Sequence, residues 1–104
     1  MKPEVRFFQS GVRDHDRRMD RMEIHARISN RPVTIITDIS EITGWKTKLK
    51  GTNVRVLTPY RAKGEQLKGL VLVDQMSSQL LLELHKLVIK QGAEFSVVDM
   101  RDGQ

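Results

Sequence analysis

The chain has 104 residues, of which 38% are hydrophobic and 30% charged, and its formal net charge is +5. This length and composition indicate one globular domain, residues 1–104, with a single core, and they exclude a disordered chain. The lack of cysteine excludes disulfides, thiolate zinc sites and cysteine nucleophiles, and the charged N-terminus predicts a cytoplasmic protein with no signal peptide and no membrane contact.

The N-terminal third of the chain carries two competing patterns. Residues 4–8 are predicted to form an edge strand. Residues 22–29 alternate between apolar and polar side chains, which is typical of a strand with one exposed face, so an antiparallel hairpin with the next strand is expected. A competing interpretation is one helix over residues 14–28, with Met22 and Ala26 at helical spacing.

The middle of the chain reads as strand, helix, strand. Residues 33–37 are β-branched and apolar, as in a buried strand. Asp38 and Glu41 are spaced as a capping box that starts a helix, and Gly51 supplies the stop before the next strand. The apolar stripe of this helix is predicted to consist of Ile39, Ile42, Trp45 and Leu49.

The C-terminal third repeats this order. Residues 69–74 form the strand, Ser77 or Ser78 caps the helix, and Gly92 ends it before a last strand at residues 94–100. Each strand-helix-strand unit predicts a parallel pair joined by a crossover. The expected fold is α/β (or α+β): a small mixed sheet with two crossover helices and an N-terminal β-hairpin, packed as a two-layer or three-layer sandwich.

An aspartate follows three of the predicted strands, at Asp38, Asp74 and Asp99. If these strands are parallel neighbours, the three carboxylates lie at the edge where open α/β sheets bind ligands. Such a cluster would suit Mg²⁺ and a phosphodiester or phosphate hydrolase. The alternative is structural and needs neither metal nor cofactor: Asp38 caps a helix, Asp74 shapes a turn and Asp99 belongs to a polar tail.

Other catalytic signatures are missing from the sequence. The stretch "GWKTKLKG" has Leu49 where a phosphate-binding loop needs its second glycine. The three histidines are too far apart for a zinc site without cysteine. Ser77 and Ser78 lie outside the Gly-x-Ser-x-Gly turn of a hydrolase. These absences favour a binding function.

Positive charge is concentrated between residues 46 and 68, where seven Lys and Arg side chains face one acid, Glu65. Lys and Arg neutralise phosphates, and a tyrosine among them can stack on an unpaired base. The predicted nucleic-acid-binding residues are Lys46, Lys48, Lys50, Arg55, Tyr60, Arg61, Lys63 and Lys68. A second basic group, whose field three aspartates partly cancel, consists of Arg13, Arg17, Arg18 and Arg21.

The C-terminal helix is apolar around most of its circumference, which indicates burial against more than one surface. We expect Leu81, Leu82 and Ile89 to contact a second copy or a partner protein. The sequence thus favours a small non-catalytic accessory protein that binds nucleic acid or an acidic protein and self-associates as a homodimer. The alternatives are the Mg²⁺-dependent hydrolase and a protein-interaction module that inhibits a larger enzyme.

Overall fold

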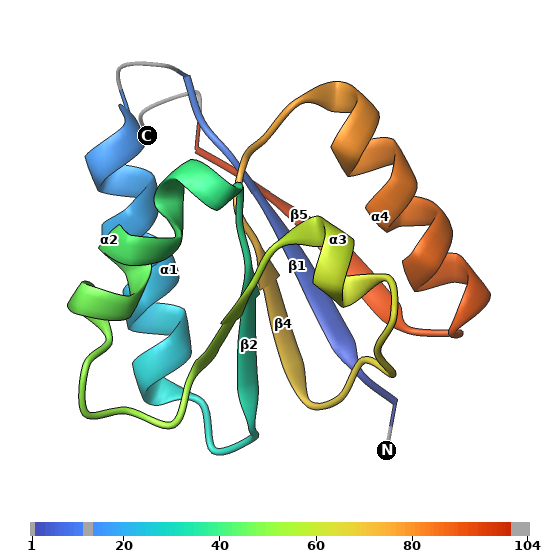
Figure 1. Cartoon of the computed structure of the whole chain (residues 1–104), viewed down its shortest axis with the longest axis horizontal. Coiled ribbons are helices and arrows are strands. Elements are labelled where there is room, and N and C mark those ends of the chain that lie inside the picture. Colours follow the sequence, from blue (N-terminus) through green and yellow to red (C-terminus); the bar gives the residue numbers. More distant parts are fainter. Residues whose placement is uncertain (1, 12–13, 101–104) are drawn as a thin grey trace.

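The structure, a computed structural model, describes residues 2–11 and 14–100. These residues form a five-stranded parallel sheet between two layers of helices (Figure 1). In chain order the elements are β1 (Glu4–Gln9), α1 (His15–Ile28), β2 (Val33–Ile36), the 3-10 turn η2 (Ile39–Glu41), α2 (Ile42–Lys48), β3 (Arg55–Leu57), α3 (Pro59–Ala62), β4 (Leu70–Val73), α4 (Ser78–Lys90) and β5 (Glu94–Asp99).

The strand order across the sheet is β3-β2-β4-β1-β5, and every neighbouring pair is parallel. The predicted α/β class is therefore confirmed, whereas the predicted mixed sheet is wrong. Because all five strands run the same way, their carboxyl ends share one edge of the sheet. The central strand β4 is buried along its whole length, as its unbroken apolar sequence predicts.

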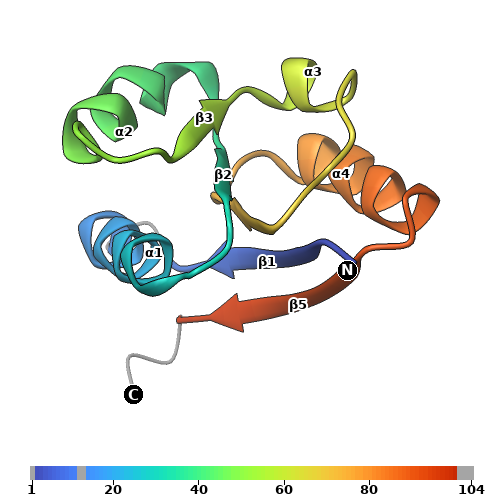
Figure 2. The ribbon, with the colours of Figure 1, turned by 90° about the horizontal axis from the view of Figure 1, so that it is seen from below.

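The helices cover both faces of the sheet, so the sandwich has three layers (Figure 2). Met22 of α1 and Trp45 of α2 pack on one face, and Leu84 of α4 and Ala62 of α3 on the other. The described part of the chain contains four α-helices instead of the two predicted, because residues 15–28 and 59–62 are also helical.

The predicted N-terminal hairpin is wrong. Residues 22–28 belong to helix α1, and the segment turns its buried side chains, Arg18, Met22 and Ala26, to the sheet at every fourth position. The alternating pattern is also present in the sequence, but Ile24 and Ile28 are exposed instead of buried. Strand β1 is not at an edge, since it lies between β4 and β5.

Several local signals are confirmed. Trp45 is fully buried, the Ser77 hydroxyl accepts a hydrogen bond from the Leu80 N–H, and Gly51 adopts a positive φ of 87° after the helix. Ile39 is exposed and not part of the apolar stripe, because the residues capped by Asp38 form a 3-10 turn and α2 starts only afterwards. None of the described helices has the length and apolar character needed to cross a lipid bilayer.

Two glycines have nearly the same backbone conformation but different surroundings, so comparing their alanine variants tests how closely the chain packs at the start of β4. Gly69 (φ 63°) precedes β4, where an added Cβ would lie 2.2 Å from the Pro32 carbonyl oxygen. Gly92 (φ 67°) follows α4, and a Cβ there would meet nothing within 4 Å. We expect Gly92→Ala to cost about 1 kcal/mol of unfolding free energy through backbone strain. Gly69→Ala should cost clearly more in the same urea titration, and equal losses would contradict the close approach.

Candidate functional site

The carboxyl edge of the sheet is built around Asp74, which follows β4 and is completely buried. Its Oδ1 accepts hydrogen bonds from Arg18 Nε at 2.7 Å and from the Gln75 N–H at 2.8 Å. Its Oδ2 accepts from Thr37 Oγ1 at 2.8 Å and from Trp45 Nε1 at 3.2 Å. The carboxylate is thus surrounded by donors from four parts of the chain.

Arg18 extends this network from helix α1. It is only 6% exposed, and its Nη1 donates to Ser10 Oγ, just after β1, at 2.8 Å. The pair therefore ties together the ends of β1, β2 and β4 and the helices on one face. Charges removed from water are tolerated only when paired and hydrogen-bonded, and both conditions hold here. This arrangement favours a structural role for Asp74.

The three predicted aspartates share the carboxyl edge but do not form one cluster. β2 and β4 are neighbours, whereas β1 separates β4 from β5 and therefore Asp74 from Asp99. Asp38 accepts hydrogen bonds from the N–H and hydroxyl of Ser40, which hold the pKa of its carboxyl below the usual value. Within residues 2–11 and 14–100, no group of three His, Cys, Asp or Glu side chains is arranged to hold a metal ion.

A small crevice of about 190 Å³ lies where β1 and β4 end. The helices that follow these two strands cover opposite faces, which makes this the usual ligand position in open parallel sheets. Its lining residues are Gln9, Ser10, Gln75, Met76, Ser78 and Leu81. None of them is ionisable, and the Gln75 side chain already accepts the Ser10 N–H at 2.6 Å. The crevice therefore offers no general acid or base.

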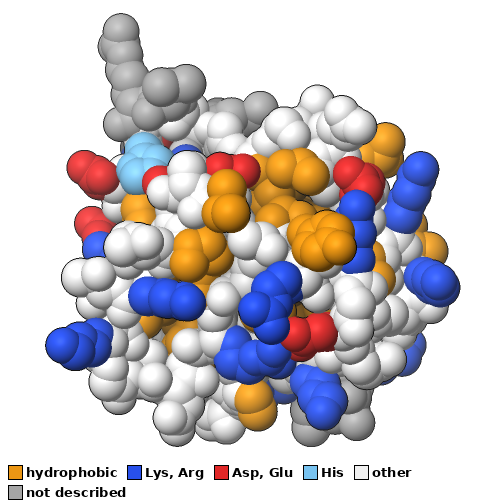
Figure 3. Space-filling view, in the orientation of Figure 1, with side chains coloured by type: hydrophobic (Ala, Val, Ile, Leu, Met, Phe, Trp, Pro, Cys, Tyr) orange, Lys and Arg blue, Asp and Glu red, His pale blue; other side chains and the backbone are white. Residues whose placement is uncertain are grey.

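A basic groove of about 460 Å³ follows the outer edge of β3, between α2 and α3. Lys46 and Lys50 line it from the end of α2, Arg55 from β3 and Arg61 from α3, and no acidic residue lines it. Figure 3 shows Lys and Arg side chains gathered over this part of the molecule. The four cations, separated by up to 15 positions in sequence, are brought together by the pairing of β3 with β2.

The other predicted nucleic-acid residues lie outside the lining of the groove. Lys48 pairs with Asp20 at 3.0 Å, which raises the pKa of its ammonium group, and Lys63 pairs with Glu83 of α4. Lys68 is exposed just before β4, at the opposite end of the strands from Asp74. Tyr60, 85% exposed, directly precedes Arg61 on α3. The folded chain thus selects four of the seven cations in this stretch.

The N-terminal arginines also separate. Arg17 and Arg21 are exposed on α1, Arg18 is buried against Asp74, and Arg13 lies outside the described residues. The sequence groups Arg18 with the other arginines of this segment as a surface cation and does not predict its burial. A signal was present, since Arg18 precedes the buried Met22 by one helical turn.

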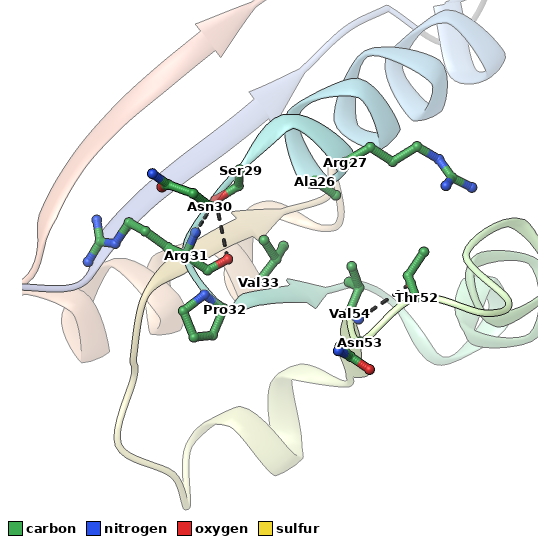
Figure 4. A pocket seen from close by; sticks show the side chains of 10 residues that line it. All are labelled: Ala26, Arg27, Ser29, Asn30, Arg31, Pro32, Val33, Thr52, Asn53 and Val54. Atoms are coloured by element: carbon green, nitrogen blue, oxygen red, sulfur yellow. Dashed lines mark hydrogen bonds between the residues drawn. The ribbon is translucent and has the colours of Figure 1, made fainter.

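A further hollow, of about 520 Å³, lies at the amino ends of β2 and β3 (Figure 4). Two arginines line it, but Figure 4 shows Arg27 and Arg31 extending away from it in opposite directions. Arg27 Nε donates to Glu23 Oε2 at 2.8 Å, and Arg31 Nη2 donates to the Lys2 carbonyl at 2.8 Å. Because both guanidinium groups are used elsewhere, this hollow is less suited to an anion than the basic groove.

No protein-family model, curated protein or solved structure matches this chain. Its function is therefore inferred from the geometry of its own residues. The parallel sheet alone does not indicate an activity, because such folds carry many unrelated chemistries.

The structural role of Asp74 predicts a large difference between two conservative variants. Asp74→Asn leaves the Arg18 charge buried without its counter-ion, which should cost about 3–5 kcal/mol of unfolding free energy. Asp38→Asn should change it by less than about 0.5 kcal/mol, because asparagine caps equally well. Urea titrations at pH 7 measure both. Trp45 is the single tryptophan and donates to this carboxylate, so its fluorescence also reports changes around residue 74. A small effect of Asp74→Asn would contradict this role.

A histidine joins the start of α1 to the turn before α2 at the same edge. His15 Nε2 hydrogen-bonds to Glu41 Oε1, and its Nδ1 lies 3.3 Å from Asp16 Oδ1. The hydrogen bond to Glu41 is the main cause that raises the pKa of His15 above its ordinary value, and Asp16 adds to it. A raised pKa means that the folded state binds the proton more tightly than the unfolded state does.

We therefore expect His15 to stabilise the fold most at acidic pH. The difference in unfolding free energy between the wild type and His15→Gln should be largest below about pH 6.5, the ordinary value, and shrink as the pH rises through the folded pKa. Urea titrations from pH 5 to 9 measure this difference. When both proteins also carry Glu41→Gln, most of the pH dependence of this difference should disappear. If the dependence is unchanged, a group other than Glu41 causes it.

Proposed function

We propose that this protein binds single-stranded nucleic acid, without catalysing a reaction, through the basic groove along β3. The observation that carries the proposal is that four cations line this groove and no acid does. Lys and Arg bind the phosphate backbone by neutralising its charge and releasing counter-ions. A groove that presents cations from several elements can follow several successive phosphates.

The cations of the groove are available to a ligand to different degrees. Among the described residues, none forms an ion pair with Lys46, Lys50 or Arg61, so their charges are uncompensated. Arg55 is held by Glu65, whose two oxygens accept from one guanidinium nitrogen at 2.7 and 2.8 Å. Glu65 thus fixes Arg55 in place, and the remaining nitrogens of the guanidinium can still donate.

The preference for a single strand comes from Tyr60. Tyr60 directly precedes Arg61 on α3 and is 85% exposed, and an exposed aromatic near a phosphate-binding cation can stack on an unpaired base. The bases of a duplex are stacked on one another and do not offer this contact. The lining of the groove contains no His, Asp or Glu, the side chains that most often act as general acids and bases, so it favours binding over catalysis.

The chain offers a matched test of the groove. Lys46 and Lys50 are exposed and four positions apart, and so are Lys86 and Lys90 on the other face of the sheet. Lys46→Gln/Lys50→Gln should weaken binding to labelled oligonucleotides about tenfold or more at low salt. It should also reduce the slope of log affinity against log salt by about 1.4, which is 0.7 for each single-strand phosphate contact.

Fluorescence anisotropy with single-stranded DNA and RNA measures both quantities. Lys86→Gln/Lys90→Gln removes the same charge and should leave affinity and slope nearly unchanged. Equal losses in the two variants would show that binding follows net charge alone. Binding that does not weaken as salt rises would contradict phosphate contacts, and binding to an acidic polypeptide but not to either nucleic acid would assign the groove to a protein partner.

The stacking role of Tyr60 has a separate test. Tyr60→Ala should weaken single-strand binding by about 1–3 kcal/mol, the usual contribution of one stacked base. Duplex binding should change little, because no unpaired base is lost. Tyr60→Phe keeps the ring and serves as the control. Equal losses on single-stranded and duplex DNA would contradict stacking.

A further inference from the structure

The exposed large hydrophobic residues of this protein gather around one edge of the sheet. Among residues 2–11 and 14–100, eight such side chains are exposed, and six of them come from β5 and from the two helices nearest to it. The six are Ile24, Ile28, Leu82, Ile89, Phe95 and Val97. Two of the three residues that the sequence predicted as an interface, Leu82 and Ile89, are in this group. We call these six residues the β5 patch.

Contacts of α4 show which way its exposed residues point. The His85 ring stacks on Phe7 of β1, with centroids 4.1 Å apart, and meets the edge of Phe95 of β5 at 5.9 Å. Glu83, on the opposite flank, pairs with Lys63, the residue directly after α3. Leu82 and Ile89 follow the His85 side of the helix, since they lie three and four positions from it. They therefore border β5, beside the half-exposed Phe95.

Contacts of α1 place its exposed residues on the same side. Asp20 and Glu23 pair with Lys48, so this flank of α1 faces α2. The His25 ring meets Phe8 of β1, with centroids 4.9 Å apart. Ile24 and Ile28, one helical turn apart, lie on the flank turned away from α2, toward β1 and β5. The β5 patch thus continues on both faces of the sheet.

The outer edge of β5 offers unpaired backbone groups. Within the described part of the chain, β5 pairs only with β1. The Glu94 N–H donates to the Pro3 carbonyl, just before β1, at 3.0 Å, and the Met100 N–H donates to the Gln9 carbonyl of β1 at 2.9 Å. These N–H groups therefore point toward β1. Backbone groups alternate in direction along a strand, so those of Phe95 and Val97 point outward. An edge of this kind can accept another strand.

The opposite edge of the sheet is different in kind. β3 has three residues, and the basic groove with Arg55 runs beside it. A short edge flanked by positive charge repels its own copy. The sheet therefore has one edge suited to self-pairing and one that is not. Pairing through a single edge closes at two copies and does not continue into a filament.

We propose that a second copy of this chain pairs antiparallel with β5 around a two-fold axis at Ser96. Such an axis is perpendicular to the sheet, so the α4 side of one copy continues into the α4 side of the other. Residues that lie opposite each other across the axis therefore point to the same face of the sheet. With the axis at Ser96, Phe95 of each copy faces Val97 of the other, two half-exposed apolar side chains. Both are outward-pointing residues, so the two pairs exchange four backbone hydrogen bonds.

Side-chain chemistry distinguishes this register from its neighbour. An axis at Val97 would also pair five residues of each strand, but it would set Phe95 opposite the carboxylate of Asp99. The axis at Ser96 instead places Ser96 opposite itself and Glu94 opposite the Val98 of the other copy. The same two-fold axis brings the exposed residues of α4, and those of α1, toward their own copies and so extends the interface beyond the strands.

The dimer has a ten-stranded sheet with a basic groove at each outer end. At about 4.8 Å between strands, the two grooves are separated by roughly 43 Å. One dimer could then hold two segments of nucleic acid, or two stretches of one strand. Dimerisation itself does not depend on nucleic-acid binding, so the two proposals can fail separately.

Light scattering after size-exclusion chromatography tests the dimer. The wild type should elute with twice the 12.0 kDa mass of the chain at micromolar concentration. Val97→Pro removes an outward N–H without breaking the pairing with β1, so this variant should be a folded monomer. The control is Val56→Pro at the other edge of the sheet, in β3. The Leu57 carbonyl accepts from the Thr37 N–H inside the sheet, so the N–H of the preceding residue, Val56, points outward and is the one that proline removes. This control should remain dimeric.

Single cysteines test the register, since the natural chain has none. Ser96 would face its own copy in a pair without hydrogen bonds, where Cα atoms are about 4.5 Å apart and a disulfide can form. Ser96→Cys should therefore give a covalent dimer on oxidation, seen on a non-reducing gel. Glu94→Cys, exposed on the same face, would be separated from its copy by about four residues, roughly 13 Å, and should not crosslink.

Each other outcome overturns the proposal. A wild type that stays monomeric up to about 100 µM would show that a second copy does not occupy the β5 patch, and a different protein would then be its partner. A dimer that survives Val97→Pro but is lost in Leu82→Glu would assign the interface to α4 alone. Crosslinking by Glu94→Cys as efficient as that by Ser96→Cys would exclude the stated register. Circular dichroism confirms that each variant is folded.

Discussion

The Arg18 guanidinium and the Asp74 carboxylate form an ion pair with almost no access to water, and the carboxyl edge of the sheet is organised around it. Asp74 follows the central strand, Arg18 comes from α1, and Thr37 and Trp45 donate to the same carboxylate. Each donor fixes a different element relative to β4. Buried charge is tolerated only when all its partners are in place, so the pair specifies one arrangement of these elements.

Because this edge is filled by structural contacts, ligand binding is better supported at the sides of the sheet. Four cations without an acidic neighbour in the lining meet at β3, where the basic groove is lined by residues of α2, β3 and α3 and by the turn after α2. Most of the exposed large apolar side chains among the described residues lie around β5. The two edges therefore have opposite character, one suited to an anion and the other to an apolar surface.

The N-terminal segment shows why one sequence pattern predicted the wrong element. Residues 22–29 alternate like a strand and also place Met22 and Ala26 four positions apart, like a helix. In the folded chain the second pattern prevails, because Arg18 extends it by a turn and gains a buried partner in Asp74. That partner is 56 residues away in sequence, so no local pattern could reveal it.

The sequence by itself determined the α/β class, the buried strand at β4, the helix stops at Gly51 and Gly92, a serine cap at residue 77 or 78, and the burial of Trp45. These features follow from periodicity, capping and glycine conformation, which act over a few residues. Only the tertiary structure decided the strand order, the burial of Arg18, and which cations share the basic groove. Those outcomes depend on pairing between distant segments: β1 inserts between β4 and β5, separating Asp74 from Asp99, and β3 docks on β2, bringing Arg55 beside α2.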